Sequence, residues 1–184
     1  MSCLKTLTGL GRSCDSNIPG LRVVYFANRE DVESVTMADG ETGVTVSAIT
    51  MASGATFYKY YFAKNAGSLT TTHVRSDENG NNYYTAVINL QFNKMEAAKH
   101  VEIEALAEGN LIAIATDNNG IHHLVGYDNY LSSEGEEIAA SGASIDDRNG
   151  YTLTLTATEK VIGRIIPAEN FDAIMSGKIT EPGA

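Results

Sequence analysis

The fold is decided by two long runs of β-forming residues, Ser68-Leu69-Thr70-Thr71-Thr72-His73-Val74-Arg75 and Tyr83-Tyr84-Thr85-Ala86-Val87-Ile88-Asn89-Leu90-Gln91-Phe92. Between them stands Ser76-Asp77-Glu78-Asn79-Gly80-Asn81-Asn82, whose Asn-Gly pair is a strong hairpin signal. A strand rises about 3.3 Å per residue, so the second run reaches roughly 33 Å, beyond the usual strand length. The pattern predicts a long hairpin that projects beyond the body of the protein.

Further β patterns lie on both sides of this hairpin. Strands are expected over residues 21–27, 43–50, 56–63, 111–116, 121–127, 151–156 and 161–166, with turns at 117–120 and 146–150. The aromatic run 56–63 predicts a strand that is covered on both faces. The chain is therefore expected to be mostly β, a β-sandwich or barrel of about nine strands with one packed helix.

That helix is expected over residues 94–108, directly after the hairpin. Asn93 is placed to cap it, Glu96 stands at the capping-box position, and Gly109 is placed to end it. One face combines Met95, Ala98, Ala105 and Leu106, with Glu102 in its middle. Glu102 is therefore a candidate interface residue, although a partly exposed position would also tolerate it.

The domain organisation predicted for residues 1–184 is a single domain with two appendages. Residues 1–20 form an N-terminal arm, and residues 167–184 form a C-terminal extension with a short helix and a loose tail. Residues 128–143 are acidic and rich in Ser and Gly, which predicts a mobile loop. No signal peptide and no membrane span are expected.

The charge balance excludes a protein that holds DNA. Thirteen Lys and Arg stand against 23 Asp and Glu, a formal net charge of −10, whereas nucleic-acid binders neutralise phosphates with basic side chains. The charge fits a solvated protein and equally a surface past which DNA slides. Cys3 and Cys14 are the two cysteines, and reduced thiols are expected, with a disulfide or a metal as the open alternatives.

The residues that could carry chemistry do not converge. Glu96, His100 and Glu104 share one ridge of the predicted helix, which is typical of a solvated ridge with weak pairing as well as of metal ligands. His122 and His123 are adjacent in a strand and point to opposite faces, so one is expected in solvent and the other hydrogen-bonded or half-buried.

His73 stands alone on its strand, and it too is expected either to face solvent or to be hydrogen-bonded or half-buried. Asp77, Asn79 and Asn81 match the first ligands of a calcium loop, but Asn82 and Ile88 stand where that loop needs Gly and Glu. No nucleophile elbow and no phosphate loop occurs. We therefore expect no catalytic residues, no cofactor and no metal, and the protein is not expected to be an enzyme.

The order of these elements resembles the major tail tube proteins of long-tailed bacteriophages, particularly phages of gut Bacteroides-type bacteria. The segments that carry the resemblance are Cys3-Leu4-Lys5-Thr6-Leu7, Leu90-Gln91-Phe92-Asn93-Lys94-Met95, Asp117-Asn118-Asn119-Gly120, Gly126-Tyr127-Asp128-Asn129 and Asp147-Arg148-Asn149-Gly150-Tyr151-Thr152-Leu153-Thr154-Leu155-Thr156. They cover most of residues 1–157 and are strand, turn and cap patterns rather than a catalytic signature.

The resemblance implies hexameric rings that stack into a hollow tube through which DNA passes without specific binding. Its partners would be other copies of the chain, the tail terminator, the baseplate or tip, and the tape measure, with assembly in the host bacterial cytoplasm and residence in the virion tail. The candidate inter-subunit and inter-ring contacts lie at the hairpin tip: Asp77, Glu78, Asn79, Gly80, Asn81, Asn82, Tyr83 and Tyr84.

Two alternatives remain open from the sequence. Another virion part of similar fold, such as a terminator, a head–tail connector or a capsid decoration protein, would have the same elements. A carbohydrate-binding or adhesive β-sandwich would use exposed aromatic side chains, which the run from Tyr58 to Tyr61 could supply.

Overall fold

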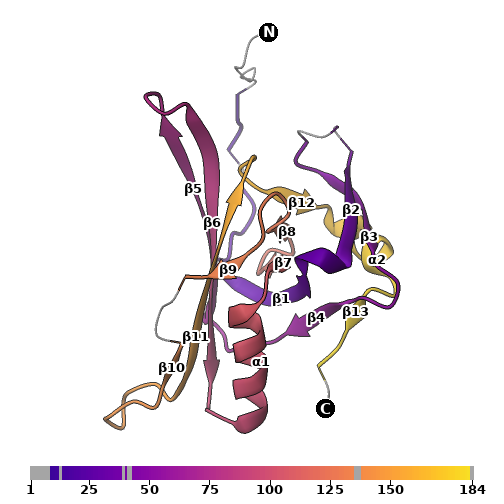
Figure 1. Ribbon diagram of the computed structural model, residues 1–184. Coiled ribbons are helices and arrows are strands. Elements are labelled where there is room, and N and C mark those ends of the chain that lie inside the picture. The colour runs from indigo at the N-terminus through magenta and orange to yellow at the C-terminus, as the bar shows by residue number, and fades with distance from the viewer. Residues whose placement is uncertain (1–8, 13, 39, 41–42, 135–137, 183–184) are drawn as a thin grey trace.

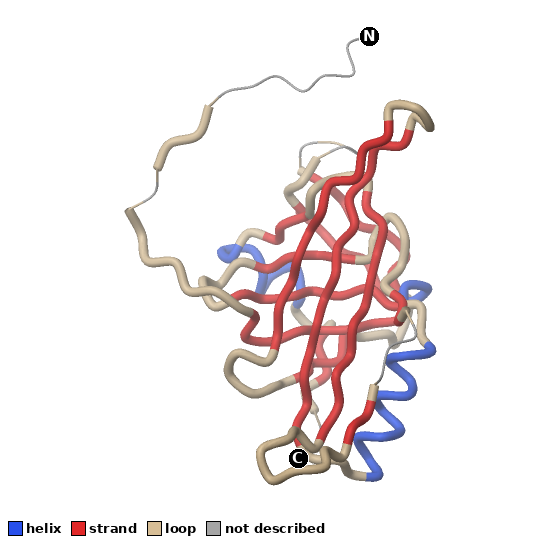
Figure 2. The backbone as a smooth tube through the Cα atoms, turned by 90° about the vertical axis from the view of Figure 1, so that its left-hand side faces the viewer, coloured by secondary structure: helices blue, strands red, loops and turns tan. Residues whose placement is uncertain are grey.

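The strands form three open sheets and the described part of the chain closes no barrel, which corrects the barrel alternative. The computed structural model describes residues 9–12, 14–38, 40, 43–134 and 138–182. The protein is mostly β, as predicted, and the short helix expected in the C-terminal extension is present at Ala168–Met175. Because this helix also packs on the core, two helices pack on the body instead of one. A five-stranded sheet crosses a six-stranded sheet, and α1 lies beside both (Figure 1, Figure 2).

The six-stranded sheet has the order β12-β8-β7-β1-β4-β13. Its strands are β12 (Arg164–Ile166), β8 (His122–Val125), β7 (Leu111–Asp117), β1 (Leu21–Asn28), β4 (Phe57–Tyr60) and β13 (Ile179–Thr180). The central strands β1 and β7 are apolar on both faces, because each face packs against a different part of the core.

The five-stranded sheet contains the predicted hairpin. Its strands are β10 (Ala139–Ala140), β11 (Gly150–Glu159), β6 (Asn81–Asn93) and β5 (Gly67–Ser76) in that order, with β9 (Ser132–Ser133) also paired to β11. The hairpin register runs from Gly67 opposite Leu90 to Ser76 opposite Asn81, so the prediction of two long paired strands is confirmed. The tip extends beyond the crossing sheet (Figure 1).

Two hydrophobic clusters make up the core, one on each face of the six-stranded sheet. The first joins Val24 and Phe26 of β1 to Ile88, Leu153 and Leu155 of the five-stranded sheet. The second joins alternate residues of β1 and β7 to the pair β2 (Val32–Met37) and β3 (Val46–Met51) and to α2 (Ala168–Met175). The 3-10 turn η1 (Arg29–Asp31) connects β1 to β2, a strand that the sequence pattern did not reveal.

The first helix, α1 (Ala97–Glu108), begins later than predicted, and the proposed cap by Asn93 is wrong. Asn93 is instead the last residue of β6, where it pairs with Gly150. Because this pairing extends the strand, the amides before the helix find other acceptors: Lys94 N–H donates to the carbonyl of Asn149 (2.8 Å) and Met95 N–H to its side chain (3.1 Å). Gly109 follows the helix as predicted.

Two other expectations are corrected by tertiary pairing. The tail after α2 is not loose throughout, because Ile179 and Thr180 of β13 pair in parallel with Phe57 and Tyr58 of β4. The stretch 128–143 is also partly fixed: Leu131 is fully buried and exchanges two backbone hydrogen bonds with Leu111 (2.9 and 2.7 Å). Residues 135–137 of this stretch lie outside the described residues.

Candidate assembly site

The hairpin tip is open to solvent. Asp77, Glu78, Asn79, Gly80, Asn81 and Asn82 are all exposed, while Tyr83 and Tyr84 are half-buried. Gly80 has a positive φ of 67°, which the tight turn requires and which glycine adopts without strain. The tip residues are therefore available for contact with another molecule.

Below the tip, local contacts hold the two strands together. His73 Nε2 lies 2.7 Å from Asn82 Oδ1, and its ring packs against Tyr84 with centroids 4.8 Å apart. Arg75 Nε donates to Asp77 at 2.8 Å, an exposed pair that contributes little to stability. The Asp77, Asn79 and Asn81 trio thus belongs to an ordinary hairpin.

The outer face of the five-stranded sheet carries no charged side chain. The register places the following residues on this face, opposite to the core: Ser68, Thr70, Thr72, Val74, Ser76, Asn81, Tyr83, Thr85, Val87, Asn89, Gln91, Asn93, Thr152, Thr154, Thr156 and Thr158. No other segment of the described chain lies over the long strands on this side (Figure 2). In a chain with 23 acidic and 13 basic residues, this outer face is distinctively neutral.

The strand β5 forms one edge of this sheet. It pairs with β6 along its full length, and no strand of the described ranges pairs with its other edge. Such an edge offers backbone donors and acceptors to any strand that approaches. The β5 edge is therefore suited to pairing with a strand of another molecule, and the outer face remains open beside it.

A groove of about 660 Å³ lies between β4, α1 and the residues after β13. Tyr58 and Tyr61 stand at the groove with 52% and 57% of their surface exposed. The prediction that residues 56–63 form a strand covered on both faces is therefore wrong, since only Phe57 of this run is buried. Phe57 enters the second core cluster and Tyr60 packs against the first, while residues 58–61 line the groove.

Glu102, the candidate interface residue, lies on the wall of this groove. Its carboxylate accepts a hydrogen bond from the hydroxyl of Tyr60, and burial followed by this hydrogen bond raises the pKa of Tyr60. The face predicted for the helix is divided: Leu106 enters the core and Met95 packs against it, whereas Ala98 and Ala105 are exposed. Ile103, which was not assigned to that face, is buried beside Leu106. Glu102 therefore belongs to the outward side of α1.

The other charged side chains of this groove pair with one another. Lys59 pairs with Glu181 at 2.8 Å, and Lys99 pairs with Glu96 at 3.2 Å. The hydrogen bond to Glu181 raises the pKa of Lys59, so this lysine stays charged. Within residues 9–182, as far as they are described, Glu102 has no ion pair.

The histidines have structural partners. His122 is buried, lies 2.8 Å from Thr116 Oγ1, and stacks on Phe171 with centroids 3.7 Å apart. Burial lowers the pKa of His122, which keeps it neutral. His123 is half-buried on the opposite face, 3.8 Å from Asp117. The prediction that these neighbours point to opposite faces is confirmed.

The ridge of Glu96, His100 and Glu104 is not gathered into a metal site among the described residues. His100 Nδ1 bonds to the hydroxyl of Tyr151, and Glu96 pairs with Lys94 and Lys99. Cys14 is exposed, and Cys3 lies outside the described residues.

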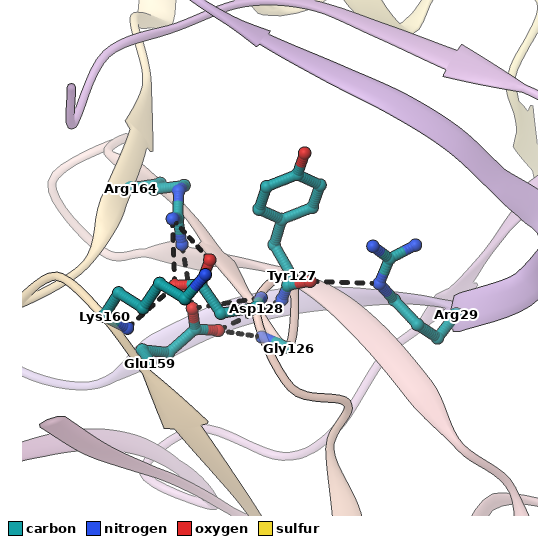
Figure 3. A network of polar contacts seen from close by, with 7 residues as sticks. All are labelled: Arg29, Gly126, Tyr127, Asp128, Glu159, Lys160 and Arg164. Carbon is teal, nitrogen blue, oxygen red and sulfur yellow. Dashed lines mark hydrogen bonds and ion pairs between the residues drawn. The ribbon is translucent and has the colours of Figure 1, made fainter. Parts of the chain in front are cut away.

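A buried ionic network, which the sequence reasoning did not find, joins the two sheets (Figure 3). Arg164 of β12 donates to Glu159 of β11 (2.8 Å) and with one nitrogen to both oxygens of Asp128 (2.9 Å each). Glu159 also accepts the backbone N–H of Gly126 (2.6 Å) and Tyr127 (3.1 Å). The network fixes the chain after β8 against the end of β11.

The two carboxyl groups titrate differently. Burial, followed by the hydrogen bond with Asp128, raises the pKa of Glu159 to about 7. Burial by itself would raise the pKa of Asp128, but hydrogen bonds from Lys160 N–H, Glu159 and Arg164 lower it overall. The shifts of the two pKa values have opposite directions, so a proton that enters the pair binds Glu159 before Asp128.

Alternation could have revealed Glu159. Tyr151, Leu153, Leu155 and Ala157 face the core, and Glu159 continues this period of two, so it also points inward. Arg164 and Asp128 carry no comparable signal, because only the pairing of β12 with β8 brings them together.

Among the described helices, neither is long and apolar enough to cross a membrane. A scan of protein-family models and searches of curated proteins and solved structures return no significant match. Any function proposed for this chain therefore rests on its own sequence and structure, in particular on the outer face, the β5 edge and the groove.

Proposed function

We propose that this chain is a structural subunit of a bacteriophage tail tube, which assembles into stacked rings, hexameric in the related family, around a DNA conduit. The observation that carries the proposal is the uncharged outer face of a long sheet that ends in β5, whose second edge pairs with no strand of the described chain. The resemblance of the sequence to major tail tube proteins supports the same conclusion.

The open edge of β5 favours assembly with other copies of the chain. A strand of ten residues with an open edge invites pairing, and native proteins cover or blunt such edges. If β5 pairs with the opposite side of a neighbouring sheet, where β11 is paired only in part by β9 and β10, the contact is head-to-tail. Repetition of that contact around an axis closes a ring and removes the free edges.

The outer face lacks the basic side chains that would bind DNA in a channel. Basic clusters hold phosphates through strong, salt-dependent attraction, and this face presents Thr, Ser, Asn and Gln without Lys or Arg. A channel lined by it would neither trap DNA nor attract it. In the virion tail the subunit would further contact a terminator, the baseplate or tip, and the tape measure.

Electron microscopy of the purified protein tests the proposal. We expect rings or tubes at high concentration, and a monodisperse monomer at every concentration and salt would refute it. Copy number in the virion separates a tube subunit, which is abundant, from a terminator or connector, which forms a single ring.

A second test addresses the channel. Thr72→Lys, Thr154→Lys and Thr156→Lys together should leave assembly intact but retain DNA, with an affinity that falls as salt rises. The matched control replaces the same residues by Gln. Unimpaired genome ejection from lysine-lined tails would refute the channel assignment.

A second candidate function is carbohydrate binding, which the exposed Tyr58 and Tyr61 at the groove favour. Tyrosine rings supply rigid apolar surfaces to which sugars can pack. Binding to a glycan array that Tyr61→Ala abolishes, with no assembly of the native protein, would favour this function.

A further inference from the structure

The N-terminal arm is fixed at its root by the turn between β7 and β8. The side-chain oxygen of Asn119 accepts a hydrogen bond from the backbone N–H of Ile18 (2.8 Å). Its side-chain nitrogen donates to the Ile18 carbonyl (3.1 Å) and to the side-chain oxygen of Asn17 (3.0 Å). Asn118 donates its side-chain amide to the Pro19 carbonyl (2.7 Å). These bonds set the direction in which the preceding residues leave the body.

Beyond this root, residues 9–12 and 14–16 of the arm are exposed to solvent. This described part of the arm leaves at the end of the molecule where the hairpin tip projects, away from α1 and β13 (Figure 1, Figure 2). Leu10 is exposed over its entire surface, which is costly for a leucine that stays in water. The arm is therefore suited to burying Leu10 on another molecule.

The groove is lined by residues of β4 and α1 and by those after β13. In Figure 1, α1 and β4 lie on the side of the molecule away from the arm. It offers the exposed rings of Tyr58 and Tyr61 to an apolar side chain. It also offers the carboxylate of Glu102, which has no cationic partner among the described residues. An apolar segment with one positive charge is the complement of this groove.

The arm has that chemistry. Residues 9–14 read Gly9-Leu10-Gly11-Arg12-Ser13-Cys14, one leucine and one arginine without an acidic residue. We propose that the arm of one copy docks in the groove of the next copy, with Leu10 against the tyrosines and Arg12 toward Glu102. An extended chain spans at most about 3.5 Å per residue, so residues 9–16 reach roughly 28 Å from the root.

The hairpin tip is a poorer occupant of the same groove. It carries Asp77 and Glu78, which would meet the carboxylates of Glu102 and Glu181. Because the arm and the elements that line the groove lie on different sides of the molecule, docking gives a head-to-tail contact that does not close on itself. The inference rests on the proposed function and adds a polarity to the stacking of the rings.

Disulfide cross-linking between different copies tests the docking. In a full-length background with Cys3→Ser and Cys14→Ser, one chain carries Leu10→Cys and a ¹⁵N-labelled chain carries Tyr61→Cys. The two are mixed under conditions of assembly, oxidised mildly, and identified by mass spectrometry. The control replaces Tyr61→Cys by Ile145→Cys, which is more exposed than Tyr61 (99% against 57%) but lies outside the groove.

We expect the 10–61 product to exceed the 10–145 product at least about tenfold, because docking raises the effective concentration of the two thiols. Arg12→Glu or Glu102→Lys should each lower the yield about two- to fivefold, as for an exposed charge pair, and the two changes together should restore it.

Three results would overturn the inference. Equal cross-linking yields at positions 61 and 145 would show that the arm does not dock in the groove. An internal cross-link in a monomer that carries both cysteines would show that the arm covers its own groove. A Gly80→Cys to Tyr61→Cys product in place of the 10–61 product would assign the groove to the hairpin tip.

The same experiment separates this inference from the proposed function. Rings or tubes of the cysteine-free protein without a 10–61 product would reject the arm contact and leave the tube subunit standing. Absence of any assembly, with glycan binding that Tyr61→Ala abolishes, would reject both and assign the groove to a sugar.

Discussion

The strands β7 and β11 are both rich in β-branched and aliphatic residues, yet their burial differs. β7 is buried at six consecutive positions, from Leu111 to Thr116, whereas β11 alternates between buried residues and Thr152, Thr154, Thr156 and Thr158. The reason is their place in the fold: β7 lies between two cores, and β11 has a core on one side and solvent on the other. The difference indicates that the five-stranded sheet is the one whose face is free for another molecule.

The largest expected effect comes from the network that joins the two sheets. Arg164→Met should lower the free energy of unfolding by about 3–5 kcal/mol, because it leaves buried carboxyls without their cation. Urea unfolding followed by circular dichroism measures this. Arg75→Met, which removes the exposed pair with Asp77, is the control and should cost less than about 1 kcal/mol. Equal losses would contradict the view that the network holds the sheets together.

The second prediction compares the two strands directly. Ile114→Ala in β7 should cost about 2–5 kcal/mol, since Ile114 is fully buried and leaves a cavity. Thr154→Ala on the outer face should cost at most about 1 kcal/mol, the range of strand propensity. A large loss at Thr154 in the unassembled protein would mean that this face is covered within the subunit.

The third prediction concerns pH. Because the pKa of Glu159 is raised to about 7 from its ordinary 4.5, the folded protein retains a proton that the unfolded chain releases. Stability should therefore fall as pH rises from about 4.5 to about 7. Glu159→Gln should remove this decline, which thermal melts across that range can measure.

The contribution of Asp128 to the pH dependence of stability has the opposite sign, because the pKa of Asp128 is lowered in the folded protein. Its contribution to stability is present above its ordinary pKa of 3.8 and is lost as pH falls below it. The decline in stability between pH 4.5 and 7 comes from Glu159, so Asp128→Asn should retain it as long as Glu159 stays buried in that variant. An unchanged decline in Glu159→Gln would show that another group causes it.

The smallest effect on stability is expected at the hairpin tip. Replacing residues 77–82 by a two-residue Asn-Gly turn should change the free energy of unfolding by less than about 0.5 kcal/mol, since these residues are exposed. The same change should shorten tubes if the tip contacts the next ring. Normal tube length and yield from the shortened variant would place the ring contact elsewhere.

Local patterns predicted much of the fold. The Asn-Gly turn and the flanking β-forming residues identified β5 and β6, and the alternation of residues 151–156 identified β11 and its inward face. The position of Gly109 identified the end of α1. These features depend on residues close in sequence, so a short window contains their cause.

Other features required contacts between distant segments. Asn93 has the chemistry of a helix cap, but pairing with Gly150 keeps it in β6 and moves the helix start to Ala97. Val32–Met37 forms β2 because it pairs with β3, and no strong turn or alternation marks it in the sequence. Among the candidate contact residues, the hairpin tip was predictable as an exposed turn, whereas the groove around Glu102 was not.

The sequence by itself determined that the chain is mostly β, where its longest hairpin turns, and which face of β11 is apolar. Only the tertiary structure decided that Tyr58 and Tyr61 lie beside a groove, that Glu159 meets Arg164, and that no part of the described chain covers the threonine face. The physical reason is that periodicity reports the polarity of a face, while what packs on that face depends on how remote strands cross.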